Sequence, residues 1–301
     1  MPGITRTDVD SLIETQVANE IFEGVVKDSK ALSMFRRLPN MTSDKTKLRI
    51  LDSLPMAYFV DEQTNNGRKQ ITKMAWDKKF INAEELAVIV PIKENVLNDT
   101  SIDIWAEVRP RLVEALAKKI DNAMFFGVDK PTGWRAGLVP SVITAGATVT
   151  ETGKLYSDIN DTMVKVEESG YDVTGLLGGV ALKGKFRMMT DTTGQPLNTT
   201  EIGSLQRNFM DNGVWDKTKA TLIAGDFTQA VYAIRQDITY KLLDQAVIQD
   251  TDGSIMYNLA QEDMVALRVV MRLGWEIPNP VNALNETETR FPFAALVPNA
   301  G

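Results

Sequence analysis

Gly179, Gly184 and Lys185 fit the spacing of a phosphate-binding loop, G-x-x-x-x-G-K. In such a loop, backbone N–H groups and the lysine hold the phosphates of a nucleotide, and a following Ser or Thr hydroxyl binds magnesium. Phe186 stands at the hydroxyl position here, and the interior of the loop is apolar. We therefore interpret the spacing as chance and predict no nucleotide site.

A second segment has the start of a calcium-binding loop, with Asp250, Asp252 and Gly253 in the first positions. Such a loop needs a bidentate glutamate at its twelfth position, where this chain has Gln261, and it needs a third oxygen ligand that is also missing. We interpret the segment as a surface turn.

Three pairs of adjacent carboxylates are further candidates for acid–base chemistry: Asp61-Glu62, Glu84-Glu85 and Glu167-Glu168. Neighbouring side chains on a strand point to opposite faces, so none of these pairs makes a ready acid–base dyad. We interpret them as solvated surface.

The chain of 301 residues contains no histidine and no cysteine. This excludes thiol nucleophiles, disulfides, Ser-His-Asp triads, and zinc or haem sites ligated by His or Cys. A carboxylate-based, metal-assisted hydrolase stays open as an alternative class, although it would have to work without a histidine ligand. We expect no catalytic residue, no metal and no cofactor.

The composition is that of a soluble globular protein, with 44% hydrophobic and 24% charged residues. Lys and Arg number 33 against 40 Asp and Glu, a net charge of −7 that opposes tight binding to the phosphates of nucleic acid. The apolar run 86–92 is far shorter than the ~20 residues that span a bilayer, and carboxylates interrupt the first thirty residues where a signal peptide needs apolar ones. The length suggests about two domains.

The N-terminal segment predicts an amphipathic helix, because Ile13, Val17, Ile21 and Val25 recur at every fourth position and Phe22 widens the stripe. The pattern does not decide whether this helix packs on its own domain or on a neighbour.

From about residue 48 to residue 92 the hydrophobic period changes to two, which predicts strands. Met74, Trp76 and Phe80 share one face of a strand with charged neighbours, and Asn66-Gly67 suits a tight hairpin turn. A lone two-stranded hairpin with so little apolar content is marginal in water. We expect it to extend outward and find its packing partner elsewhere.

A long helix is predicted between Ser101 and Gly127, with Pro110 inside it. Its apolar stripe consists of Trp105, Val108, Leu112, Leu116, Ile120 and Met124. An interior proline costs about 3 kcal/mol, so we expect a kink or a restart near Arg109. Later segments predict a helix over 157–169 and strands over 221–224 and 231–234, whereas the run 264–277 mixes Val, Leu and Met with arginines. The fold class is therefore α+β.

The order of these elements resembles that of the major capsid proteins of tailed double-stranded DNA phages, which have the Hong Kong 97-type capsid fold. The segments that carry the resemblance are 56–62, 79–93, 95–103, 121–127, 131–133, 225–227 and 268–277. Each segment alone is a weak motif, and their order and spacing make the match specific.

The resemblance implies a division of the chain into an N-terminal arm, an extended hairpin loop, a peripheral domain with a long spine helix, and an axial domain. The implied ranges are 1–40 for the arm and its helix, 41–94 for the loop, 95–133 and 261–301 for the two parts of the peripheral domain, and 134–260 for the axial domain. It also implies that the arm and the loop lie across neighbouring subunits.

The function implied by the resemblance is structural: hexamers and pentamers of this subunit close into an icosahedral shell around phage DNA. The implied partners are other copies of the chain, a portal protein, separate scaffolding or decoration proteins, and packaged double-stranded DNA bound weakly and without specificity. The resemblance further implies that the subunit assembles in the host cytoplasm, is finally located in the virion, and has no membrane as a partner. A cellular encapsulin-type shell around protein cargo is the alternative within the same fold.

Residues of the arm and the loop are the candidates for contacts between subunits, namely Phe22, Asn66, Lys69, Met74, Trp76 and Phe80. In some family members, a loop lysine also forms a covalent cross-link between subunits with an asparagine of the peripheral domain. The corresponding position here falls near Asp263, with Asn258 the nearest amide, and we therefore predict no covalent cross-links.

Overall fold

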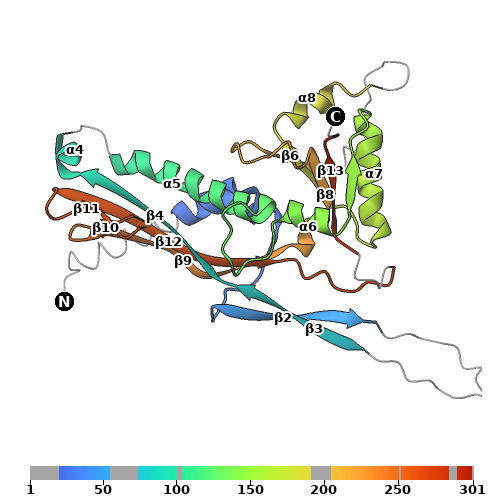
Figure 1. The fold of residues 1–301 in the computed structure, drawn as a ribbon, viewed down its shortest axis with the longest axis horizontal. Helices are drawn as coiled ribbons and strands as arrows, with labels where there is room; N and C mark the ends of the chain where they lie inside the picture. Colours follow the sequence, from blue (N-terminus) through green and yellow to red (C-terminus); the bar gives the residue numbers. More distant parts are fainter. Residues whose placement is uncertain are drawn as a thin grey trace, which may run out of the picture.

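The computed structural model describes residues 20–54, 74–99, 104–190, 205–250, 252–284 and 290–299. An elongated sheet lies beside a more compact one, and a two-stranded ribbon projects away from both (Figure 1). We call the elongated sheet the peripheral sheet; its strands lie in the order β1 (Arg36–Arg37), β9 (Val231–Leu243), β12 (Met264–Glu276) and β4 (Glu84–Lys93). The axial sheet has the order β5 (Thr148–Thr150), β13 (Phe293–Val297), β8 (Leu222–Gly225), β6 (Gly175–Gly179) and β7 (Gln206–Met210).

The long helix α5 (Ile104–Asp121) runs along the peripheral sheet (Figure 1). Its stripe residues Leu112, Leu116 and Ile120 are buried, as their spacing predicts. The helix continues through Pro110, so it does not restart near Arg109, and the alternative of a kink there stays a prediction. Pro110 lies on the exposed side, where solvent can compensate for the missing backbone hydrogen bond.

The backbone departs from regular α-helical geometry at the C-terminal end of this long helical element. There α5 passes into a π-helical turn, η1 (Asn122–Phe126), which ends at Gly127 with a φ of 67°. A positive φ of this kind suits glycine, which has no Cβ to clash.

The described part of the N-terminal arm packs on its own subunit. Residues 20–28 are helical and α2 (Lys30–Met34) follows; Ile21, Val25 and Leu32 are buried against the core. The ring of Phe35 lies 5.5 Å from that of Phe125 and 6.0 Å from that of Trp275, centroid to centroid. Part of its apolar stripe is thus covered by the core of the same subunit, and contacts of the arm with a neighbouring subunit stay a prediction. Residues 1–19 lie outside the described part.

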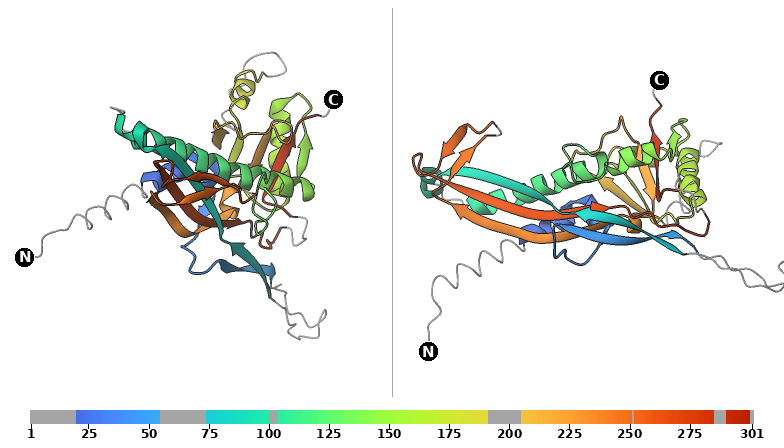
Figure 2. Two further views of the ribbon diagram at one scale, coloured as in Figure 1. Left: turned by 60° about the vertical axis from the view of Figure 1, so that its left-hand side comes forward. Right: turned by 60° about the horizontal axis from the view of Figure 1, so that its bottom comes forward.

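The projecting ribbon consists of β2 (Lys45–Ser53) and β3 (Ala75–Asn82), which pair antiparallel (Figure 2). Its base packs on the body of the subunit through a small cluster in which Met41 and Ile81 contact Val231 and Ala233 of β9. Beyond that base, every described residue of β3 from Ala75 to Lys78 is exposed.

Helices α6 (Leu138–Thr144) and α7 (Leu155–Glu168) pack against the axial sheet, and α8 (Leu182–Arg187) follows β6. The predicted helix over 157–169 corresponds to α7, and the strands predicted over 221–224 and 231–234 correspond to β8 and the start of β9.

The sheets draw their strands from different ranges than the resemblance implies. Strand β9, in the expected axial range 134–260, pairs with β12 in the peripheral sheet, from Val231↔Glu276 to Leu243↔Ala266. Strand β4, in the expected loop range 41–94, pairs with the other side of β12. Strand β13, in the expected peripheral range 261–301, lies between β5 and β8 in the axial sheet. Each sheet thus combines distant stretches of chain, because backbone pairing follows spatial proximity and not chain order.

Candidate assembly interface

One face of the β2–β3 ribbon combines exposed aromatic rings with positive charge. Register places Trp76, Lys78 and Phe80 of β3 on the same face, opposite Leu51, Arg49 and Lys47 of β2. Trp76 is 59% exposed and Phe80 is 41% exposed. The ammonium of Lys45 lies 4.3 Å from the centroid of the Phe80 ring. We call this surface the basic hairpin face; its residues are Lys45, Lys47, Arg49, Trp76, Lys78 and Phe80.

The opposite face of the ribbon holds it to the subunit. Lys79 Nζ donates a hydrogen bond of 3.2 Å to the carbonyl oxygen of Ile277, just beyond the end of β12. Burial lowers the pKa of Lys79, and nearby Glu276 opposes that shift. Lys79 therefore serves as an anchor at the base of the ribbon and does not belong to the basic hairpin face.

The sequence-predicted contact residues have different surroundings. Met74 is 47% exposed and lies directly before the first residue of β3. Phe22 is half-buried against the core, with the Arg37 guanidinium carbon 5.5 Å from its ring centroid. Asn66 and Lys69 lie outside the described residues. The prediction omitted the cations of β2, although their alternation in the run Lys-Thr-Lys-Leu-Arg would have indicated a common face.

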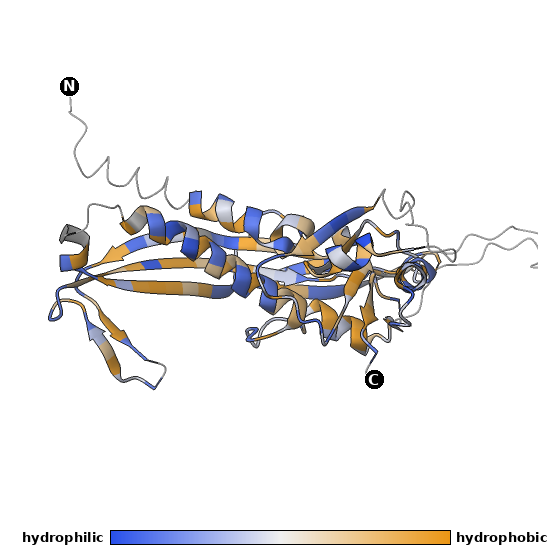
Figure 3. Ribbon diagram, turned by 90° about the horizontal axis from the view of Figure 1, so that it is seen from above, coloured by the Kyte–Doolittle hydropathy of each residue, from blue (hydrophilic) through white to orange (hydrophobic). Residues whose placement is uncertain are grey.

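A second hairpin stands at the far end of the peripheral sheet. It consists of β10 (Val247–Gln249) and β11 (Ile255–Asn258), and it leaves the sheet at an angle (Figure 3). Ile248 and Tyr257 pack inward on Leu259 and Met264. Val247, Ile255 and Met256 are between 50% and 64% exposed.

This second hairpin is strongly acidic. Residues 244–263 contain no Lys or Arg and five carboxylates: Asp244, Asp250, Asp252, Glu262 and Asp263. The backbone N–H and the hydroxyl of Ser254 both donate to Asp252 Oδ1, which lowers the pKa of that carboxyl and closes the turn. We call residues 244–263 the acidic hairpin.

A buried carboxylate joins three segments of the subunit. Asp121, at the end of α5, accepts hydrogen bonds from Ser29 Oγ at 2.7 Å and from the backbone N–H of Lys30 and Ala31. Asn212 Nδ2 donates a fourth bond of 2.8 Å from the axial side. Burial raises the pKa of Asp121, while the four hydrogen bonds oppose that rise. The arrangement ties the arm, the spine helix and the axial part together.

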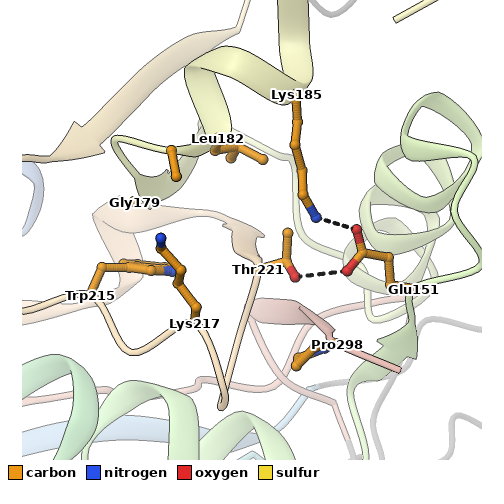
Figure 4. Close-up of a pocket in the computed structure, with 9 residues that line it drawn as sticks. Glu151, Gly179, Leu182, Lys185, Trp215, Lys217, Thr221 and Pro298 are labelled. Atoms are coloured by element: carbon orange, nitrogen blue, oxygen red, sulfur yellow. Dashed lines mark hydrogen bonds and ion pairs between the residues drawn. The ribbon is translucent and has the colours of Figure 1, made fainter. Parts of the chain in front are cut away.

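The loop with the phosphate-binding spacing is occupied by protein side chains (Figure 4). The ammonium of Lys185 pairs with Glu151, whose second carboxylate oxygen accepts a 3.2 Å bond from Thr221. A Cβ on Gly179 would come within 2.8 Å of the Trp215 ring. The cavity beside Gly179 has a volume of about 140 Å³, and Lys185 and Glu151 also line a larger one of about 730 Å³. The lysine of the loop is thus paired with a carboxylate of its own subunit.

Among the described residues, no group of three or more acidic side chains is placed to hold a metal ion. No helix in that part of the chain is long and apolar enough to cross a membrane.

The sequence pattern of the Phage capsid family matches residues 10–284. The chain belongs to the phage capsid family. The major capsid protein of Staphylococcus phage 80alpha is 25% identical over 284 residues, which cover 89% of this chain and 82% of that protein.

Solved structures from other phages share the fold. A chain from Microbacterium phage Oxtober96 is 34% identical with a TM-score of 0.80, and the match covers 90% of this chain and 91% of that one. A chain from Mycobacterium phage Cain is 30% identical with a TM-score of 0.81, and the match covers all of both chains. The capsid subunit described here is thus an α+β protein with the Hong Kong 97-type fold, and its two projecting hairpins are features of a protein that forms part of a virion.

Proposed function

We propose that this capsid subunit assembles as hexamers and pentamers into an icosahedral shell that encloses phage double-stranded DNA, and that it carries no catalytic activity. The observation that supports the proposal is the basic hairpin face, which leaves Trp76 and Phe80 exposed on a ribbon that extends away from the body. Burial of such a side chain contributes about 1.5–3 kcal/mol, so a neighbouring copy that covers both rings stabilises the ribbon as well as the contact.

Packaged DNA, a portal protein and separate scaffolding or decoration proteins are the proposed partners, with assembly in the host cytoplasm. The net charge of −7 supports weak binding to DNA, because a shell whose subunits repel phosphate holds its contents without adhering along their length.

Replacing both exposed rings tests the proposal. The variant Trp76→Ser with Phe80→Ser should fold normally, because both rings are solvent-exposed in the lone subunit. We expect it to lose rings and closed particles in negative-stain images at concentrations where the wild type forms them. Met188→Ser is the matched control, since that side chain is 81% exposed but lies on the axial part.

The outcome that contradicts the proposal is a soluble, folded double variant that forms shells as readily as the wild type. The contents of purified particles separate the two kinds of container. Double-stranded DNA supports the phage shell, whereas protein cargo without DNA favours the encapsulin-like alternative.

A further inference from the structure

We propose that Asn212 is a site of spontaneous deamidation, and that its conversion to aspartate or isoaspartate breaks the contact between the axial part and Asp121. Asn212 lies in the loop between β7 and β8 and is followed by a glycine. The inference is independent of the proposed function, because it concerns the chemistry of a single subunit.

Deamidation is an attack of the chain on one of its own side chains. The backbone nitrogen of the next residue attacks the carbonyl carbon of the asparagine side chain, loses its proton to water or hydroxide, and closes a cyclic imide. The side-chain nitrogen takes up a proton from water and leaves as ammonia. Water then opens the ring at either of its carbonyl carbons, which gives aspartate or isoaspartate. One water is consumed and one ammonia released, so the reaction needs no oxidant, reductant or cofactor.

Gly213 supplies an accessible attacking nitrogen. The residue is exposed, and a Cβ built on it would meet no atom within 4 Å, so the space around it is open. Within the described part of the chain, its N–H group donates no hydrogen bond. Glycine also has no side chain to hinder the approach of its nitrogen to the carbonyl carbon. No element has to unfold before the attack.

The side chain of Asn212 is folded back along the chain toward this nitrogen. Its Oδ1 accepts a hydrogen bond of 3.2 Å from the N–H group of Val214, two residues further on. A donor to this oxygen also stabilises the negative charge that develops there during the attack. Nδ2 donates a bond of 2.8 Å to Asp121 Oδ2, which fixes the amide at its other end. Both bonds hold the reacting carbonyl in one orientation.

The product cannot make the contact that Asn212 makes. An aspartate at position 212 would present acceptor oxygens to the buried carboxylate of Asp121, where the amide presented a donor. Two ionised carboxylates at this distance repel each other and share no hydrogen bond. The other three bonds of Asp121 come from Ser29, Lys30 and Ala31 of the arm. The reaction therefore detaches the axial part from this site and leaves the arm in place.

Peptide mapping of the aged subunit tests the proposal. The folded, unassembled subunit is incubated in mildly alkaline buffer, and a second sample is incubated in urea. Trypsin then releases the peptide 208–217, in which tandem mass spectrometry distinguishes Asn212 from Asn208. We expect the folded subunit to convert Asn212 at least about tenfold faster than Asn208, because the extended backbone of β7 keeps the side chain of Asn208 away from the next nitrogen. The proposal is overturned if Asn212 converts only in urea, or if both residues convert equally fast in the folded subunit.

Two variants test the route and the consequence separately. Gly213→Asn keeps a residue that tolerates positive φ but places a side chain beside the attacking nitrogen, so it should slow the conversion of Asn212. An unchanged rate would refute the attack by this nitrogen. Asn212→Asp reproduces the product, and we expect it to unfold at a lower urea concentration than Asn212→Ala, because repulsion is added to the lost bond. Equal midpoints would refute the effect on Asp121.

Discussion

Asp121 is the residue on which three parts of the subunit depend. Both of its carboxylate oxygens accept two hydrogen bonds, from the arm on one side and from the arm and Asn212 on the other. Asp121 is fully buried. Replacing one of its carboxylate oxygens with an N–H group would therefore leave buried hydrogen-bond donors facing each other without an acceptor.

We therefore expect Asp121→Asn to destabilise the subunit by roughly 2–4 kcal/mol, because its amide group must face donors at one of the two oxygen positions. Urea unfolding of the unassembled subunit measures this loss. Asn212→Ala is the control; it removes one of the four bonds and should lower the free energy of unfolding by only about 1 kcal/mol. An Asp121→Asn variant as stable as the wild type contradicts the assigned role.

The pH dependence of this site has a definite sign. Burial raises the pKa of Asp121 above its ordinary value of 3.8, so the folded state holds this proton at a higher pH than the unfolded chain does. The contribution of Asp121 to the free energy of unfolding therefore falls as the pH rises from about 4 through the raised pKa, and is constant above it. Asn at this position does not titrate. The stability advantage of the wild type over Asp121→Asn should therefore be larger at about pH 4.5 than at about pH 7 in paired urea titrations, and an advantage that shrinks on acidification would reverse the assignment.

Single residues show where sequence reasoning succeeds and where it fails. The absence of a Ser or Thr hydroxyl at position 186 can be read from the sequence alone, whereas the pairing of Lys185 with Glu151 and the approach of Trp215 to Gly179 can be seen only in the structure. The bond between Ser29 and Asp121 joins residues 92 positions apart, and no local pattern indicates such a pair. The exposed rings at Trp76 and Phe80 follow from strand alternation, whereas their role in assembly is a proposal.

At the scale of elements, Gly274 sets how closely the ribbon approaches β12. A Cβ there would overlap the carbonyl oxygen of Asn82 and the side chain of Ile81, both at the base of β3. Glycine therefore allows the ribbon to rest directly on the end of the peripheral sheet.

We expect Gly274→Ala to displace the base of the ribbon and to lower the free energy of unfolding by about 1–3 kcal/mol through this overlap. Limited proteolysis should then cut the ribbon faster than in the wild type. Gly184→Ala is the matched control, because no atom lies within 4 Å of its added Cβ and alanine favours the helix there. If the ribbon of Gly274→Ala is cleaved at the same rate as that of the wild type, the close approach at Gly274 does not hold the ribbon in place.

Elements with a strong period were predicted well, and elements defined by long-range pairing were not. The apolar stripe of α5 is a property of a short window of sequence, and it is confirmed at Leu112, Leu116 and Ile120. The predicted restart at Pro110 failed because the cost of a proline depends on which side of the helix it faces. The acidic hairpin was missed as an element, since its strands have three and four residues and too few positions to establish a period.

At the scale of the whole molecule, the subunit has a basic end and an acidic end. At about 0.1 M salt the screening length is about 10 Å, so the repulsion between subunits of net charge −7 is already weak beyond close contact. We therefore expect the cations of the basic hairpin face, in short-range contact with a neighbouring copy, to make the main electrostatic contribution to assembly.

Raising the salt to about 1 M shortens the screening length to about 3 Å and should raise the concentration at which particles form. Light scattering across a salt series measures this threshold. A variant with Lys47, Arg49 and Lys78 all replaced by Gln should show a smaller salt effect. A threshold that falls with salt in the wild type would show that general repulsion between subunits dominates instead.

The resemblance visible in the sequence was sufficient to predict the fold class, and the family match confirms it. The expected ranges 134–260 and 261–301 do not correspond to the two sheets, because contiguous ranges cannot represent a chain that passes between sheets several times. Strands β9 and β13 are the clearest cases, each paired within the sheet to which its range was not assigned.

The position of β13 has a consequence for how the subunit is made. This strand is the last of the described strands to be synthesised, yet it lies inside the axial sheet, with β5 on one side and β8 on the other. We therefore expect the axial sheet to be completed only after residues 293–297 have emerged from the ribosome. A chain that terminates before residue 293 lacks this strand, and we expect it to be unable to complete the sheet.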